Sequence, residues 1–230
     1  MKNKMNIAKR FGLFAMLFFT VVSCDKLDTV GNHSIRSFGE LLNSAPQLAA
    51  RYDVNGGWYF SAPDGSARFI WSLNFAKSPL FDAMLEFDAV PFIAAGLEPS
   101  KLPGNFYFDS KSNLLVVGTR LGTEQLQGYS DESPLTSYQQ IVKLKRDAIG
   151  YHSAMDHYGI NLGDGNLFEW ANNLNTNDKD IVFVLNPDPF IKAGVDPNKI
   201  EGWAFAKVPA EDEKGRMIEV DKILKPFNLL

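Results

Sequence analysis

Histidine and aspartate side chains gather at one point in the second half of the 230-residue chain. His152, Asp156 and His157 lie within six residues of one another, and imidazole and carboxylate groups are ligands of zinc. A helix over this segment would place His152 and Asp156 on one face, because residues four apart are neighbours on a helix. A zinc site needs a third or fourth ligand, and the sequence shows no second cluster that would supply it. The three residues are therefore a metal-site candidate with an incomplete ligand set, and histidines near a helix C terminus are the alternative.

A second segment, residues 173–180, has the alternating oxygen-bearing side chains of a calcium-binding loop. It lacks the central glycine and the distant bidentate glutamate that such loops use. Connections rich in Asn and Asp also form turns through hydrogen bonds to their own backbone. We therefore expect a turn here, and we predict neither a metal nor another cofactor for the chain.

The sequence gives no combination of a nucleophile, a base and an orienting group. The histidines are His33, His152 and His157, and residues 128–132 match the G-x-S-x-G pattern of hydrolases only in part. Glycine-rich patterns that bind phosphate or dinucleotides are not found in the sequence. A non-enzymatic role is therefore favoured.

Cys24 is the sole cysteine, so an internal disulfide cannot form. Before it, residues 1–10 carry four basic side chains, and residues 11–22 form an uncharged apolar run, shorter than the ~20 residues of a membrane-spanning helix. Residues 21–24, Val-Val-Ser-Cys, resemble the lipobox of bacterial prolipoproteins, in which a small residue precedes the cysteine. The resemblance covers residues 1–24 alone, and Val21 stands where leucine is commoner. It implies a signal peptide at residues 1–23 and a membrane anchor of acyl chains on Cys24, on the periplasmic or outer side of a cell-envelope membrane.

The residues after Cys24 leave the membrane leaflet open. Asp25 resembles an inner-membrane retention signal of enteric bacteria, whereas acidic residues at this place accompany surface export in other phyla. Residues 24–34 lack hydrophobic periodicity and are predicted to form a lipidated tether. Cleavage before Cys24 would remove four of the 23 basic residues and none of the 27 acidic ones, leaving a net charge near −8. Such a chain is repelled by phosphate backbones, so we expect no nucleic-acid partner, and it shows no polybasic membrane patch.

One sequence pattern occurs twice in the chain. Residues 91–104 and 189–202 align without a gap at an offset of 98, and eight of the fourteen positions are identical. Trp71 and Trp170 match at an offset of 99. A period near 100 is too long for a solenoid repeat and indicates a duplicated half-domain. We therefore divide the body into repeat unit 1, residues 35–130, and repeat unit 2, residues 131–230.

Each repeat unit contains a predicted helix followed by antiparallel strands. Ser37 with Glu40, and Ser137 with Gln140, match the capping box that begins a helix, and the second helix is predicted to run to about residue 155. The predicted strands surround Asp-Gly hairpin turns and cover 58–62, 67–73, 83–90, 106–108 and 114–119, then 158–162, 167–171, 180–185, 203–207 and 217–220. A short helix is predicted for residues 221–227. The fold class is therefore α+β: two tandem homologous units, each a helix packed on an antiparallel sheet, forming one globular body.

The aligned segments both open with Pro-Phe-Ile-x-Ala-Gly. This pattern predicts one helical turn with proline at its start and glycine in a left-handed conformation at its end. Phe92 and Phe190 would then lie in the core, and Gly96 and Gly194 would end the turns. A paired binding loop is the alternative interpretation.

Aromatic residues are frequent in the predicted strands, where successive side chains point to opposite faces. Most would form a second core layer between the units, and any left exposed would make a binding surface. The candidates for that surface are Trp58, Phe60, Trp71, Tyr107, Trp170 and Trp203.

We therefore expect a lipid-anchored envelope protein with a non-enzymatic binding role toward a protein partner or an envelope component. A carrier of a small apolar ligand is the alternative, which an internal cavity would favour and a filled interior would disfavour. A hydrolase of envelope polymers is a further alternative. It needs paired carboxylates in one cleft, from residues such as Glu86, Asp88 or Glu169.

Overall fold

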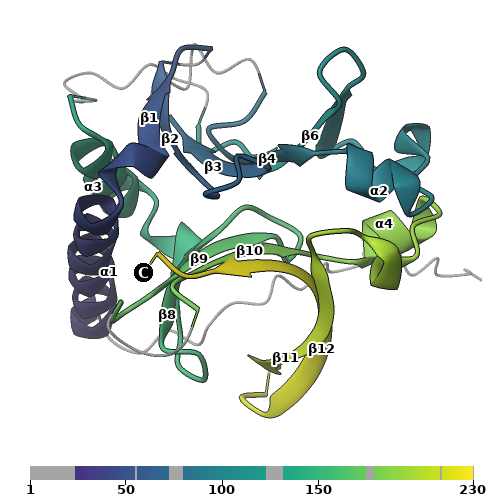
Figure 1. The fold of residues 1–230 in the computed structure, drawn as a ribbon. Helices are drawn as coiled ribbons and strands as arrows, with labels where there is room; N and C mark the ends of the chain where they lie inside the picture. The colour runs from purple at the N-terminus through teal and green to yellow at the C-terminus, as the bar shows by residue number, and fades with distance from the viewer. Residues whose placement is uncertain are drawn as a thin grey trace, which may run out of the picture.

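Two antiparallel sheets with the same strand order form the body of the protein (Figure 1). The structure, a computed structural model, describes residues 24–54, 56–72, 80–122, 132–174, 179–212 and 214–229, with side chains from Thr29 onward. Within these residues the first sheet has the order β1-β2-β3-β4-β6-β5 and the second β7-β8-β9-β10-β12-β11. The matching topology confirms the predicted α+β fold of two similar units.

The strands of the first sheet are β1 (Ala49–Tyr52), β2 (Gly57–Ser61), β3 (Ala67–Trp71), β4 (Ala83–Asp88), β5 (Phe106–Asp109) and β6 (Leu114–Thr119). Those of the second sheet are β7 (Ile149–His152), β8 (His157–Asn161), β9 (Leu167–Ala171), β10 (Ile181–Leu185), β11 (Ala204–Glu211) and β12 (Met217–Phe227).

The inner faces of the two sheets pack on each other through aromatic side chains. Phe69 and Trp71 on β3, and Phe168 and Trp170 on β9, alternate with residues that point outward, and all four are fully buried. The rings of Phe69 and Phe168 come from different sheets and stack with centroids 4.5 Å apart. The predicted core layer between the units is therefore present.

Helices α1 (Cys24–Ser44) and α3 (Pro134–Leu144) lie side by side at one end of the sheets (Figure 1). Each reaches the sheet of the other repeat unit, because α1 packs on β7 and β9 while α3 packs on β2. Phe38 of α1 contacts both Trp71 and Trp170, with ring centroids 5.5 and 5.2 Å away. These exchanged contacts join the two units into one body.

Helix α1 includes residues 24–34, which the sequence predicts to be a tether. The face that α1 turns toward α3 carries small residues: Gly31 and Ser34 are buried, and a Cβ on Gly31 would lie 3.1 Å from Val142 Cγ1. Small residues let two helices approach closely but add nothing to a hydrophobic period, so the helix is not visible in the sequence pattern. Ser37 lies inside α1, and its predicted role as a helix cap is therefore wrong.

The second helix also begins and ends earlier than predicted. Ser133 is the N-cap of α3, since its Oγ accepts a hydrogen bond from Thr136 N at 3.0 Å, so the predicted capping box at Ser137 is wrong. The helix stops at Leu144 rather than near residue 155, because the 3-10 turn η3 (Arg146–Ala148) and β7 follow it. In the first unit Pro46 begins the 3-10 turn η1 (Pro46–Leu48), as a proline that interrupts a helix should.

The C-terminal residues 221–227, predicted to be a short helix, are part of β12. They pair with β10 in a register that runs from Leu185 opposite Ile223 to Ile181 opposite Phe227. The backbone hydrogen bonds of this central pairing replace those that an isolated helical turn would make. The helix prediction for this segment is therefore wrong.

At the other end of the sheets, the two aligned segments meet. They contain α2 (Val90–Ala94) with the 3-10 turn η2 (Pro99–Lys101), and α4 (Asp188–Lys192) with η4 (Pro197–Lys199). We call residues 90–98 and 188–196 the paired turns. Glu98 N donates to Ala193 O at 2.8 Å, and Asp196 N donates to Ala95 O at 2.9 Å, so each turn hydrogen-bonds the other symmetrically.

The glycines of the paired turns explain why this segment is repeated so closely. Gly96 and Gly194 have φ of +108° and +99°, and a Cβ on Gly96 would lie 2.6 Å from Gly194 O. Phe92 and Phe190 are fully buried beneath them, with ring centroids 5.1 Å apart. The predicted positions of the two phenylalanines in the core and of the two glycines in left-handed conformations are therefore confirmed.

Candidate functional site

The six aromatic residues predicted for a binding surface differ in how far they are buried. Phe60, Trp71 and Trp170 are fully buried between the sheets, so they take no part in an exposed surface. Trp58 and Trp203 are partly buried against the core, and Tyr107 on β5 is 46% exposed. The structure does not bring the six side chains together on one open face.

Two histidines named as metal-site candidates meet a glutamate on the outer face of the second sheet. We call His152, His157 and Glu169 the histidine cluster. In the strand register His152 is opposite His157, and Gly159 is opposite Glu169. Glu169 points outward because its neighbours on β9 point into the core. Gly159 leaves room for it, since a Cβ there would lie 3.1 Å from Glu169 Cγ.

The carboxylate of Glu169 faces both histidines. Its Oε1 lies 3.5 Å from His152 Nδ1, and its Oε2 lies 3.9 Å from His157 Nδ1. Burial raises the pKa of Glu169, but hydrogen bonding and charge from the two histidines outweigh burial and hold that pKa below its ordinary value. In return, the hydrogen bond to Glu169 raises the pKa of His152 above its ordinary value, against the effect of burial.

The long hairpin of β11 and β12 extends below the rest of the second sheet in Figure 1, and its strand β11 contacts the histidine cluster. His152 Nε2 lies 2.9 Å from Pro209 O on β11, and the carbonyl can only accept, so Nε2 must carry a proton. Nδ1 faces a carboxylate, so the imidazolium form donates in both directions. His152 therefore links Glu169 on β9 to the hairpin. Lys222 on β12 makes a second contact between the hairpin and the β8–β9 turn, because it donates to Gly165 O at 2.9 Å.

The structure corrects the geometry predicted for the metal candidate. His152 is the last residue of β7, and Asp156 lies in the following turn with φ of 52°, so the two do not share a helix face. Asp156 Oδ1 accepts hydrogen bonds from Tyr151 at 2.6 Å and from Asn172 at 3.2 Å. Over the part of the chain that the structure describes, no group of three or more His, Cys, Asp or Glu side chains is arranged to hold a metal ion.

The calcium-like segment is described only at its ends, because residues 175–178 lie outside the described residues. Asp180, at its end, is buried, and its Oδ2 accepts a hydrogen bond from Leu229 N at 2.7 Å. Asp82, the matching residue of the first unit, accepts from Leu121 N at the same distance. These two carboxylates therefore have a structural role that both units share.

The outer face of the first sheet carries a different polar set. Arg68 and Glu86 form an ion pair, and the Tyr52 hydroxyl donates to Glu86 Oε2 at 3.1 Å. Burial, with the charge and hydrogen bond of Glu86, raises the pKa of Tyr52 to about 12. Tyr52 occupies the position that His152 has in the second unit, so the outer faces differ where the inner faces match.

The acids named for a polymer hydrolase do not meet in one cleft. Glu86 lies on the outer face of the first sheet and Glu169 on that of the second, with the aromatic core between them. Asp88 Oδ1 accepts a hydrogen bond from Val90 N at 2.9 Å, at the start of α2.

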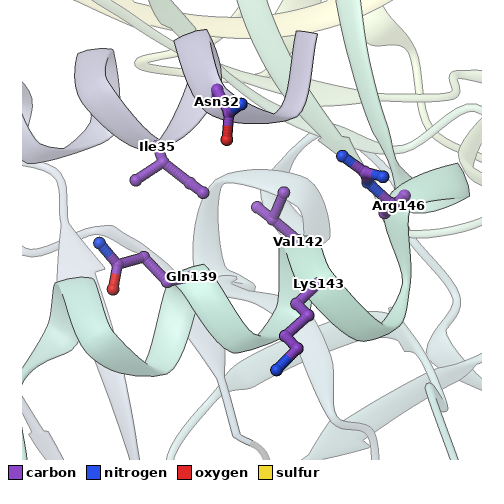
Figure 2. A pocket seen from close by; sticks show the side chains of 6 residues that line it. All are labelled: Asn32, Ile35, Gln139, Val142, Lys143 and Arg146. Atoms are coloured by element: carbon purple, nitrogen blue, oxygen red, sulfur yellow. The ribbon is translucent and has the colours of Figure 1, made fainter. Parts of the chain in front are cut away.

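A groove of about 230 Å³ opens between α1 and α3 (Figure 2), and we call it the helix groove. Its lining residues come from both helices and from η3: Asn32, Ile35, Gln139, Val142, Lys143 and Arg146. Ile35 and Val142 point toward each other across it in Figure 2. Sequence reasoning missed the groove because it predicted a tether in place of the first three turns of α1.

Three apolar side chains are exposed on the paired turns, at the end of the molecule opposite α1 and α3 (Figure 1). Val90 is 52% exposed, and Ile93 and Ile191, which occupy matching positions in the two turns, are 40% and 46% exposed.

Comparisons of the chain with protein-family models, with curated proteins and with solved structures gave no significant match. None of the described helices is both long enough and apolar enough to cross a membrane.

Proposed function

We propose that the chain is a bacterial lipoprotein, anchored in the cell envelope through Cys24, whose body has a non-enzymatic binding role. The observation that carries the proposal is the sequence of residues 1–24, where a basic segment and a short apolar run lead to a lipobox-like cysteine. Residues 1–23 lie outside the described residues. Lipidation also accounts for a lone cysteine in an exported protein.

The path of α1 supports a close attachment of the body to the membrane. Cys24 is the first residue of α1, and the same helix continues to Phe38 and Leu41, which are fully buried in the core. Acyl chains on Cys24 would therefore hold the body near the bilayer surface through a helix rather than through a flexible linker.

Two features of the body favour binding over the alternatives. The space between the sheets is filled by stacked aromatic rings such as Phe69 and Phe168, which counts against a carrier with an internal ligand cavity. The carboxylates of Glu86 and Glu169 lie on opposite outer faces, which counts against a hydrolase that uses this pair.

We assign the partner-binding surface to the paired turns. They lie at the end of the sheets away from α1, and they expose Ile93 and Ile191 at matching positions. The two turns present the same exposed apolar side chain, and backbone hydrogen bonds from Glu98 N to Ala193 O and from Asp196 N to Ala95 O hold them together.

The anchor is tested by expressing the full precursor in a bacterial host supplied with an alkyne-tagged fatty acid. We expect the wild-type chain to incorporate the label, to sediment with membranes and to begin at Cys24 by mass spectrometry. The Cys24→Ser variant should lose the label. Labelling that persists in this variant would contradict the proposal.

The binding surface is tested by placing a photo-crosslinking amino acid at position 93 or 191 in intact cells of the native host. We expect a discrete crosslinked species from both positions. Val54, which is 63% exposed in the β1–β2 turn, is the matched control and should give none. Equal products from all three positions would contradict the assignment, and a bound small molecule seen by native mass spectrometry would favour the carrier.

A further inference from the structure

The helix groove lies close to the proposed lipid attachment site. Asn32 and Ile35 follow Cys24 by 8 and 11 residues on the same helix. At 1.5 Å of rise per residue, they lie about 12 Å and about 17 Å from Cys24 along the helix axis. A tilted α1 would bring the groove into the headgroup layer, and an upright one would keep its near end within about 12 Å of the anchor.

The α3 side of the groove carries a charge opposite in sign to that of the chain. Lys143 and Arg146 line it, Lys145 lies between them in sequence, and none of the lining residues is acidic. Two acids lie near the lining residues in sequence: Asp147 follows Arg146 and is exposed, and Asp28 precedes Asn32 by one turn of α1. The mature chain carries a net charge near −8, so this short basic run at the end of α3 is a local exception to an acidic surface.

The other lining residues complement a small amphipathic anion. Asn32 and Gln139 offer amide donors, while Ile35 and Val142 contribute apolar surface from the two facing helices. The volume of about 230 Å³ is below the roughly 300–1,000 Å³ of pockets that enclose drug-sized ligands. It is therefore suited to a phosphate with a few carbon atoms rather than to a whole lipid.

We propose that the helix groove binds the phosphate-bearing headgroup of an anionic phospholipid. Lys143 and Arg146 supply the positive charge, the two amides donate to phosphate or glycerol oxygens, and Ile35 with Val142 contact the glycerol carbons. The proposal rests on the proposed function, because in the cell the anchor on Cys24 is what would hold the groove at a bilayer. Bound headgroups would fix the orientation of the body on the membrane.

The test uses the mature chain, residues 24–230, with Cys24→Ser so that acyl chains make no contribution. Flotation with vesicles of phosphatidylcholine alone is compared with flotation with vesicles that contain about 30% phosphatidylglycerol. We expect binding to the anionic vesicles only, and weaker binding as salt is raised. Each cation near an anionic surface contributes about 1 kcal/mol, so Lys143→Gln with Arg146→Gln should weaken binding roughly 25-fold and Lys143→Gln alone roughly fivefold.

The matched control removes the same charge at the other end of the molecule. Lys101 and Lys199 are exposed on η2 and η4, and Lys101→Gln with Lys199→Gln should change vesicle binding less than about twofold. Arg146 packs beside Gly31 of α1, so thermal unfolding checks that each variant is folded, and the single Lys143→Gln variant avoids that contact.

Three results would overturn the inference. These are equal binding to both vesicle types, equal losses in the groove and control variants, or stabilisation by inorganic phosphate with no vesicle binding, which would indicate a soluble anion as the ligand. Fatty-acid labelling of Cys24 in the precursor is a separate measurement. A negative result for headgroup binding can therefore be distinguished from a negative result for lipidation.

Discussion

At the scale of single residues, one hydrogen bond is present in only one of the two repeat units. Trp170 Nε1 donates to Ser37 Oγ at 2.9 Å, within the core. The matching pair, Trp71 and Ser137, is also buried, but neither Trp71 Nε1 nor Ser137 Oγ has a hydrogen-bond partner in the described structure. Two serines that the sequence presents as equivalent therefore have different energetic roles.

We predict that Ser37→Ala lowers the free energy of unfolding by about 1–3 kcal/mol, because it leaves the Trp170 N–H buried without an acceptor. Ser137→Ala should leave stability within about 0.5 kcal/mol of wild type or raise it, because it removes a buried hydroxyl that lacks a partner. Both serines lie inside helices, so the gain in helix propensity is common to the two variants. Urea denaturation followed by tryptophan fluorescence measures the difference, and equal losses would show that the two sites are equivalent.

At the scale of elements, local sequence patterns predict the hairpins well and the short edge strands poorly. Asp-Gly turns and apolar runs locate β2, β3, β8 and β9, because turn chemistry and alternation act within a few residues. The edge strands β1 and β7 have only four residues each and are partly exposed, so their composition carries no alternation. Their pairing with β2 and β8 depends on contacts that a local pattern does not contain.

The histidine cluster illustrates the same limit for the site. The sequence places His152 and His157 close together, but Glu169 joins them only through the register of β7, β8 and β9. The glycine at position 159, opposite Glu169, is a signal that becomes readable once that register is known. The helix groove was missed for a different reason, since Gly31 and Ser34 bury a helix face without apolar side chains.

The hairpin of β11 and β12 should respond to pH through His152. Glu169, His157 and Lys222 are the charged or titratable groups that face this region from β9, β8 and β12. The pKa of His152 is raised in the folded state, so its contribution is full below the unfolded value near 6.5 and is lost as pH rises through the folded value. The pKa of Glu169 is lowered, so its contribution is present above its unfolded value and is lost as pH falls through the folded one.

We therefore predict that stability declines between about pH 6 and pH 8.5 as His152 loses its proton, and that His152→Gln reduces this decline, because glutamine can still donate to Pro209 O but does not titrate. Urea denaturation at both pH values measures the change. Hydrogen exchange at amides of β11 should show whether the loss is local to the hairpin. An unchanged pH slope in the variant would contradict this role of His152.

At the scale of the whole molecule, the two units contact each other at both ends of the sheets. The paired turns hydrogen-bond each other at one end, and at the other end α1 and α3 each pack on the sheet of the other unit. We predict that Gly96→Ala or Gly194→Ala destabilises the chain by about 1–3 kcal/mol, because each glycine has a positive φ and abuts the carbonyl of the other. Gly104→Ala is the control from the same repeated segment. A Cβ there has open space, so thermal unfolding of this variant should match that of wild type.

The exchanged contacts also predict that neither repeat unit folds alone. In the separated units, residues 24–130 would lack the β7–β9 surface that α1 covers, and residues 131–230 would lack the β2 surface that α3 covers. Each would also expose an inner face of aromatic rings that the other sheet buries. We expect either unit to show no cooperative urea transition by circular dichroism, whereas residues 24–230 together should unfold in a single transition. A sigmoidal transition in an isolated unit would mean that its helix can fold back onto its own sheet, and the duplicated halves would then be independent domains that happen to share a core.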